Sequence, residues 1–152
     1  MYASLTARLL TVKRNYQTGV NITEQIFEAL KNNEIKLLPG LTIQQTECMQ
    51  EITSGKEELK ETVKNIIETY NVQADEYKVQ HILPLFTQIQ KENILDLSRE
   101  IYELEVFLQR ILYRNQDMLD AIIRSTQTIV DTAVDYSENE YKESQIFLNE
   151  KF

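Results

Sequence analysis

The chain has 152 residues, of which 42% are apolar and 26% charged, a composition typical of one globular domain that buries a core. Three Gly and two Pro are too few for the frequent turns of a β-sandwich or a barrel, so we expect an all-α protein of long helices. The formal charge of −8 repels polyanions and argues against nucleic-acid binding.

Composition also argues against an enzyme, a metal site and a bound cofactor. The chain has a single His, His81, and a single Cys, Cys48. A di-iron site in a helical bundle needs two Glu-x-x-His pairs, and here Glu76 lies five residues before the single His. The three Gly are isolated and form no phosphate-binding loop. We interpret Cys48 as a small core residue and His81 as a structural or surface residue.

The sequence predicts neither a membrane span nor secretion. No apolar run approaches the ~20 residues needed to cross a bilayer, so no membrane insertion is expected. Residues 1–8 lack the basic-then-apolar order of a secretory signal, which makes a cytoplasmic location the default expectation.

Apolar residues spaced three and four apart predict a first helix over residues 4–31. Gly19 weakens its middle and could mark a kink. Asn32-Asn33 interrupts the pattern, and residues 35–38 form a short apolar turn before Pro39-Gly40, which disfavours a continuous helix there.

Thr42 and Gln45 match a capping box, which predicts a second helix that starts near Thr42. Lys56 falls in one slot of its apolar seam, and Gly55 is expected to fray the helix. The remaining seam positions are Met49, Ile52, Leu59, Val63, Ile66 and Tyr70. Residues 71–75 are interpreted as a connection.

The most regular pattern predicts a long third helix over residues 85–134, and Pro84 either opens it at the first turn or bends a helix begun near Asp75. Asn115 is the polar residue inside its heptad seam. It either fixes the register through a hydrogen-bonded partner or lies at a solvated seam edge. The seam positions, eight of them apolar, are Leu97, Ile101, Leu104, Leu108, Ile111, Asn115, Met118, Ile122, Ser125 and Ile129.

The apolar face of this helix widens after Ile111, to roughly 140° at 100° per residue. A second helix of the same molecule, a second copy of the chain, or the helix of a different partner can cover it, and the sequence does not choose between them. The candidate partner-binding residues on this face are Met118, Leu119, Ile122, Ile123, Ile129 and Val130.

After Val134 the chain becomes acidic, with spaced aromatic residues and few aliphatic ones. We therefore divide it into a helical domain, residues 1–134, and an acidic C-terminal segment, residues 135–152. This segment is either a frayed, solvated terminus or an amphipathic segment that closes over a partner helix. Its candidate anchors are Tyr136, Tyr141 and Phe147. The whole pattern predicts an elongated antiparallel helical hairpin or bundle of about three long helices, with coiled-coil-like packing.

Three stretches resemble the FlgN family of flagellar type III export chaperones. Residues 26–35 are similar to the family's helix that runs into a small polar break and a Leu-rich turn. Residues 41–52 are similar to its second helix, and residues 101–119 to its closing helix. The family's break is often Gly-Asp, where this chain has Asn32-Asn33.

The resemblance implies a cytoplasmic, all-helical binding protein that catalyses no reaction. Its clients would be the C-terminal helices of hook-associated proteins, which it would keep soluble and unassembled and deliver to the export apparatus. The alternative is a coiled-coil adaptor or self-assembling structural protein, whose heptads serve only contacts between copies.

Overall fold

The computed structural model describes the backbone of residues 1–151 and the side chains of residues 1–140 and 142. It divides into two compact units, a bundle unit of residues 1–115 and a C-terminal unit that begins at Gln116, and each is described by itself. The described residues form helices and no strand, which confirms the all-α class. The elements are α1 (Tyr2–Lys31), η1 (Ile35–Leu37), α2 (Leu38–Thr69), α3 (Val79–Ile82), η2 (Leu83–Leu85) and α4 (Gln88–Lys151).

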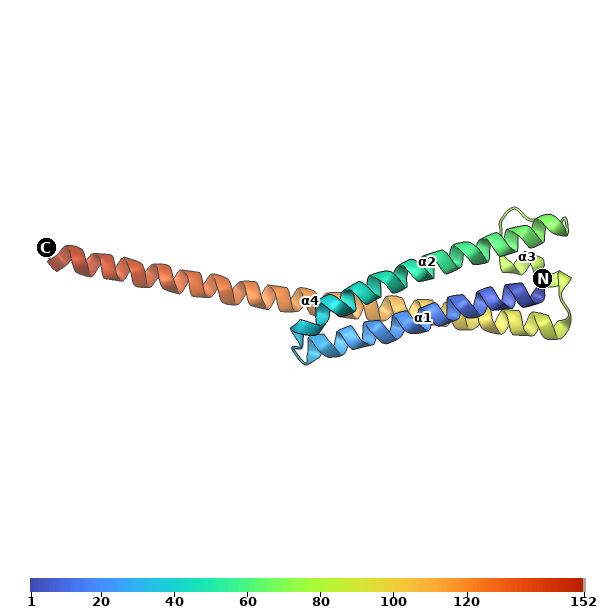
Figure 1. Cartoon of the computed structure of the whole chain (residues 1–152). Helices are drawn as coiled ribbons and strands as arrows, with labels where there is room; N and C mark the ends of the chain where they lie inside the picture. The colour runs from blue at the N-terminus through green and yellow to red at the C-terminus, as the bar shows by residue number, and fades with distance from the viewer. Residues whose placement is uncertain (152) are drawn as a thin grey trace. The chain divides into compact units, whose positions relative to one another are not determined.

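The helices α1 and α2 pack along each other as an antiparallel hairpin that the short η1 turn connects (Figure 1). The predicted first helix is confirmed, with its start two residues earlier than expected. Its apolar residues recur every three or four positions, which places them on one face, and that face is buried. The buried residues in its first half are Leu5, Leu9, Val12 and Tyr16.

An Asn in the left-handed conformation lies two residues after the end of each long helix of the hairpin. Asn33 has φ 57° and Asn71 has φ 50°. Asn tolerates this conformation better than most residues, because its short amide makes local hydrogen bonds. In each turn the next backbone N–H donates to a carbonyl five residues back, and the pairs are Glu34 with Ala29 (2.8 Å) and Val72 with Ile67 (3.0 Å). The Asn32-Asn33 break is therefore a helix stop.

The start of α2 differs from the prediction. The helix begins at Leu38, so Pro39 and Gly40 lie in its first turn. Pro is tolerated there because the N–H that it lacks has no partner within the helix. The capping box predicted at Thr42 is wrong, since Thr42 lies inside the helix and no side chain caps the N-terminus.

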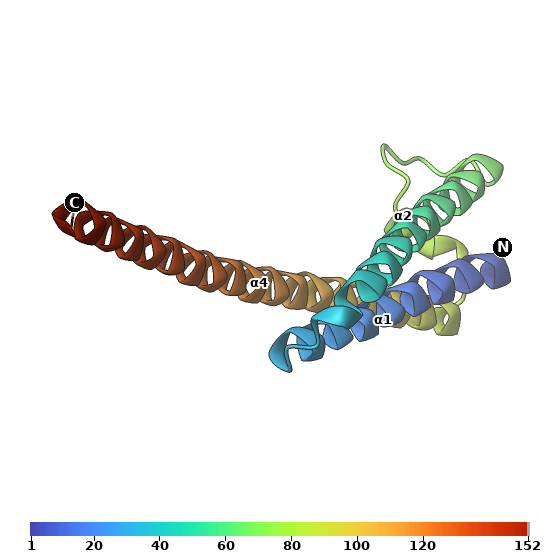
Figure 2. The same ribbon diagram turned by 60° about the vertical axis from the view of Figure 1, so that its left-hand side comes forward.

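The segment from α2 to α4 corrects the expected role of Pro84. This residue lies in the η2 turn, so it neither opens the long helix nor bends one begun near Asp75. Figure 2 shows the connection between α2 and α4, which contains this turn. The long helix starts at Gln88, three residues later than predicted. A capping box marks this start: the Thr87 Oγ1 accepts from the Gln90 N–H at 3.4 Å, and the Gln90 Oε1 accepts from the Thr87 N–H at 3.1 Å.

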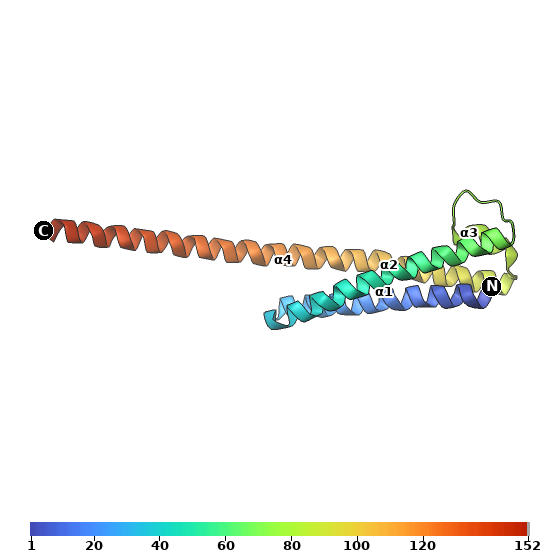
Figure 3. The same cartoon turned by 45° about the horizontal axis from the view of Figure 1, so that its top comes forward.

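The main core lies where the start of α1, the end of α2, the end of α3, Phe86 and the first part of α4 meet (Figure 3). Tyr2 extends this core: its ring tilts against Phe86, with centroids 6.0 Å apart, and its hydroxyl accepts from the Asn93 amide at 2.6 Å. The core residues are Leu5, Leu9, Val63, Ile66, Ile67, Ile82, Phe86, Ile94 and Leu97.

Three helices of the bundle unit pack closely together at Gly19. A Cβ built on it would lie 3.3 Å from Leu108 Cδ2, 3.4 Å from Ile52 Cδ1 and 3.5 Å from Cys48 Sγ. α1 continues through this residue as one helix, so Gly19 does not interrupt it. The missing side chain serves close packing instead. Cys48 is buried here, as its interpretation as a core residue predicted.

Gly55 has the same role on α2. It is buried, and a Cβ built on it would lie 3.2 Å from Asn15 Nδ2 and 3.4 Å from Val12 Cγ2 of α1. Lys56 was predicted to occupy a seam position, but it is exposed. The buried Gly55 occupies that position instead. The expectation that Gly55 frays the helix is wrong, because α2 is continuous across it.

A polar contact joins the three helices in the middle of the bundle unit. The Tyr16 hydroxyl donates to Glu105 Oε1 at 3.0 Å, and Lys56 Nζ donates to the same oxygen at 3.2 Å. Burial, together with the nearby carboxylate of Glu105, raises the pKa of Tyr16 above its ordinary value of 10.0.

The raised pKa predicts a loss of stability in alkali. The folded state favours the neutral phenol, so the stabilisation is fully present below the unfolded pKa and is lost as pH rises through the higher folded pKa. We expect the free energy of unfolding to fall less for Tyr16→Phe than for the wild type between about pH 9 and about pH 11. Urea titrations at both pH values measure this, and equal losses in the two proteins would contradict it.

Candidate partner-binding surface

In the first part of α4, up to Asn115, the residues of the heptad seam face the α1–α2 hairpin. Leu97, Leu108 and Ile111 are buried, and Ile101 and Leu104 are half-buried. This confirms the seam predicted for these residues, which cover the α1–α2 hairpin as a third helix.

Asn115 ends the buried part of the seam and has a hydrogen-bonded partner. It is 7% exposed, and its Nδ2 donates to the Thr23 backbone carbonyl of α1 at 2.8 Å. Gln45 of α2 donates to the hydroxyl of the same Thr23 at 3.0 Å. Three helices therefore meet in one polar layer, which supports the register-fixing interpretation over that of a solvated edge.

Removing the Asn115 amide should destabilise the bundle unit. Asn115→Ala removes the bond to Thr23 and leaves a small cavity, so we expect a loss of about 1–3 kcal/mol in the free energy of unfolding. Gln116→Ala, an exposed neighbour, is the control and should change it by less than about 0.5 kcal/mol. Equal effects of the two changes in urea titrations would show that the polar layer contributes nothing specific.

Arg114 adds an ionic contact beside this layer. Its guanidinium lies 3.0 Å from a carboxylate oxygen of Glu24 and 3.7 Å from the centroid of the Phe27 ring. About a third of each charged side chain is exposed, so the ion pair contributes little, and the ring contact adds packing on α1.

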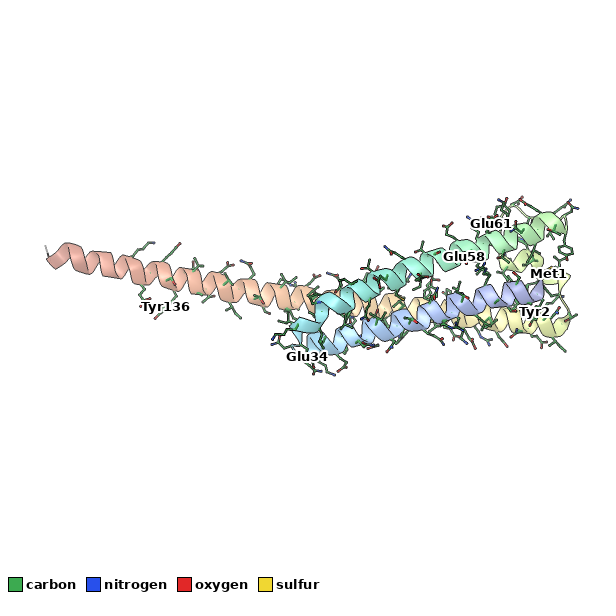
Figure 4. The ribbon with its side chains drawn as sticks, in the orientation of Figure 1. Met1, Tyr2, Glu34, Glu58, Glu61 and Tyr136 are labelled. Carbon is green, nitrogen blue, oxygen red and sulfur yellow. The ribbon has the colours of Figure 1, made fainter. Side chains whose placement is uncertain are left out.

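The C-terminal unit presents the predicted apolar face as an exposed surface. Met118 is half-buried, and the other candidate residues on the helix face are between 36% and 68% exposed: Leu119, Ile122, Ile123, Ile129 and Val130. Tyr136 is 73% exposed and projects from the helix (Figure 4). Tyr141 and Phe147 lie outside the residues whose side chains the structure describes. Val134, half exposed on the same face, was missed, although its spacing of four from Val130 indicated it.

The opposite face of this unit is polar and has its own stabilising contacts. Gln116 donates to Asp120, and Gln127 donates to Asp131, both at 2.9 Å and both four residues apart. Such pairs support a helix that has little tertiary packing. The face carries acidic charge beside the apolar residues.

The helix continues beyond its predicted end at residue 134, to Lys151. The physical reason is that residues 135–151 contain no Gly or Pro and several strong helix formers. The change to acidic and aromatic residues alters the surface of the helix without stopping it. The predicted domain boundary at 134 lies within the C-terminal unit.

A groove of about 590 Å³, which no sequence pattern predicted, lies at the turn between α1 and α2. Glu24, Glu28 and Glu34 contribute acidic groups to it, and Leu37 and Leu41 apolar ones. Figure 4 places Glu34 at this turn. No periodic signal could indicate the groove, because its lining comes from two helix ends and a short turn.

No cluster of three His, Cys, Asp or Glu among the described residues could hold a metal ion. None of the helices within that part of the chain combines the length and the apolar character that a bilayer span requires. Comparison with known proteins gives no match to the chain among family models, curated proteins or solved structures.

Proposed function

We propose that the protein is an export chaperone of the FlgN type, which acts in the cytoplasm and catalyses no reaction. In this proposal it binds the C-terminal helices of hook-associated proteins and keeps them soluble and unassembled before secretion. The candidate contact residues are those of the exposed apolar face and the aromatic anchors that follow it.

One observation carries the proposal: a row of large apolar side chains stays exposed along the C-terminal unit. Exposed faces of this kind usually mark sites of interaction. An amphipathic client helix suits such a surface, because its apolar anchors insert while its charges stay outside. Half-buried Met118 is adaptable enough to fit imperfectly matched clients, since its unbranched thioether repacks easily.

A second candidate function is a coiled-coil adaptor or a self-assembling structural protein. The observation in its favour is the heptad seam, which runs in sequence from Leu97 through Ile129 without a slip. In that case other copies of the chain, and no client, would cover the apolar face.

The two functions differ in what the purified chain binds. A chaperone should be a monomer or a weak dimer, and it should bind a purified, unassembled hook-associated protein in a calorimetric titration. A scaffold should form a tight oligomer by light scattering and show no heat with that client. Absence of binding by a monomeric chain would contradict both functions.

A further inference from the structure

We propose that the client covers the exposed apolar face with two helices at once, rather than with one. This inference rests on the proposed function and specifies the architecture of the partner. The evidence comes from α4, which runs through both units. The same side of this helix is covered by other helices in the bundle unit and is exposed in the C-terminal unit.

Eighteen residues make five turns of an α-helix, so positions eighteen apart lie at the same angle around the axis. Residues 118–133 of the C-terminal unit therefore have equivalents in the bundle unit, residues 100–115. Ile129 corresponds to Ile111, which is buried, and Ile123 corresponds to Glu105, which is half-buried.

In the bundle unit each edge of this face makes an ion pair with a different helix. On the first edge, Lys13 of α1 pairs with Glu100, the equivalent of Met118. On the second edge, Lys56 of α2 pairs with Glu105, the equivalent of Ile123. Leu108, between the edges, lies where Gly19 of α1 and Ile52 of α2 approach each other. Coverage from edge to edge thus takes both helices of the hairpin.

The C-terminal unit has the same two edges, and both are apolar. Edge A consists of Met118, Ile122 and Ile129, and edge B consists of Leu119, Ile123 and Val130. At 100° per residue the centres of the edges lie about 100° apart, which is wider than the seam of a two-stranded coiled coil. A single helix would leave one edge in water, whereas a helix pair covers both.

Charge beside edge B specifies one of the two client helices. Asp120 and Asp131 follow that edge around the helix, at about 200° and 220° when Met118 is set to 0°, and the basic Arg124 follows them at about 240°. The client helix on edge B should therefore carry Lys or Arg on its outer side. Beside edge A lie Ser125 and Thr132, which are uncharged.

The test compares two matched substitutions in the full-length chain, one on each edge. Ile129→Asp changes edge A and Ile123→Asp changes edge B, at residues that are 68% and 57% exposed. Thr128→Asp, on the polar face, is the control. The probe is a purified, unassembled hook-associated protein, titrated by calorimetry, with stoichiometry from sedimentation.

If the client contributes two helices, a substitution on either edge should weaken its binding. We expect each Ile→Asp change to weaken binding at least about tenfold, the control to change it less than about twofold, and one client to bind one chain. Circular dichroism should show unchanged helicity in all three variants, because the replaced side chains make no core contacts.

The contradicting results separate the two proposals. Wild-type binding in which one edge behaves like the control, or in which two clients bind one chain, would overturn the two-helix partner and leave the chaperone function standing. A wild-type chain that binds no hook-associated protein would overturn the proposed function and this inference together.

Discussion

Ile122→Asp combined with Ile129→Asp should abolish client binding while the bundle unit stays folded. Both side chains are exposed in the chain, so a carboxylate at either position is solvated until a client arrives. Binding would then bury two unpaired charges, which is far more costly than burying a neutral polar group. We expect affinity to fall at least about 100-fold, which corresponds to about 2.7 kcal/mol.

The stability of the double variant is the necessary control for this result. Substitutions at exposed sites usually change the free energy of unfolding by less than about 0.5 kcal/mol, and we expect no more here. A second control, Gln127→Asp on the polar face, should bind the client like the wild type. Retention of binding in the double variant would show that this face does not contact the client.

Gly19→Leu should destabilise the bundle unit by about 3 kcal/mol or more, the largest stability effect that we expect from a single substitution. The added side chain would have to enter a space where even a Cβ lies 3.3 Å from Leu108 and 3.4 Å from Ile52. Close-packed interiors have no room for this volume, so the helices must move apart. Urea titration followed by circular dichroism measures the loss.

Gly40 supplies the matched control for Gly19. It is also helical, but a Cβ built on it meets no atom within 4 Å. Gly40→Ala should therefore stabilise the chain by about 0.5–1 kcal/mol, because Ala loses less backbone entropy than Gly in a helix. If Gly19→Leu were as stable as the wild type, the three helices would not meet at Gly19 as closely as described.

The long helices were predictable, because apolar residues repeat every three or four positions over most of the chain. Their start points were harder to predict, as two similar motifs show. Thr42 and Gln45 have the same spacing as Thr87 and Gln90, yet only the second pair caps a helix. The backbone arrives extended at Phe86, while Leu37 before α2 is already helical. A capping box forms only where the preceding chain leaves the N–H groups free.

The seam of α2 shows a second limit of the sequence pattern. Hydropathy alone predicts that Gly55 frays the helix and that Lys56 occupies the seam position. In the structure Gly55 occupies it, because a residue without a side chain lets α1 pack close to α2. The choice depends on the distance between two helices, which no local pattern contains.

The candidate surface was predictable in part. The widening after Ile111 indicated an apolar face, and six of the candidate residues lie on it. The sequence could not show where its burial ends, because the heptads continue unchanged through Asn115. That limit depends on Thr23, which lies 92 positions earlier in the chain.

The sequence separation between Thr23 and Asn115 also determines when α4 can pack against the hairpin during folding. Tyr16 and Glu105 are 89 positions apart, and Thr23 and Asn115 are 92 positions apart. During synthesis α1 and α2 leave the ribosome before the first part of α4 does, so the side of the hairpin that α4 later covers is exposed to water during that interval. Docking of α4 is thus the last step in the folding of the bundle unit, and the step with the largest loop-closure entropy.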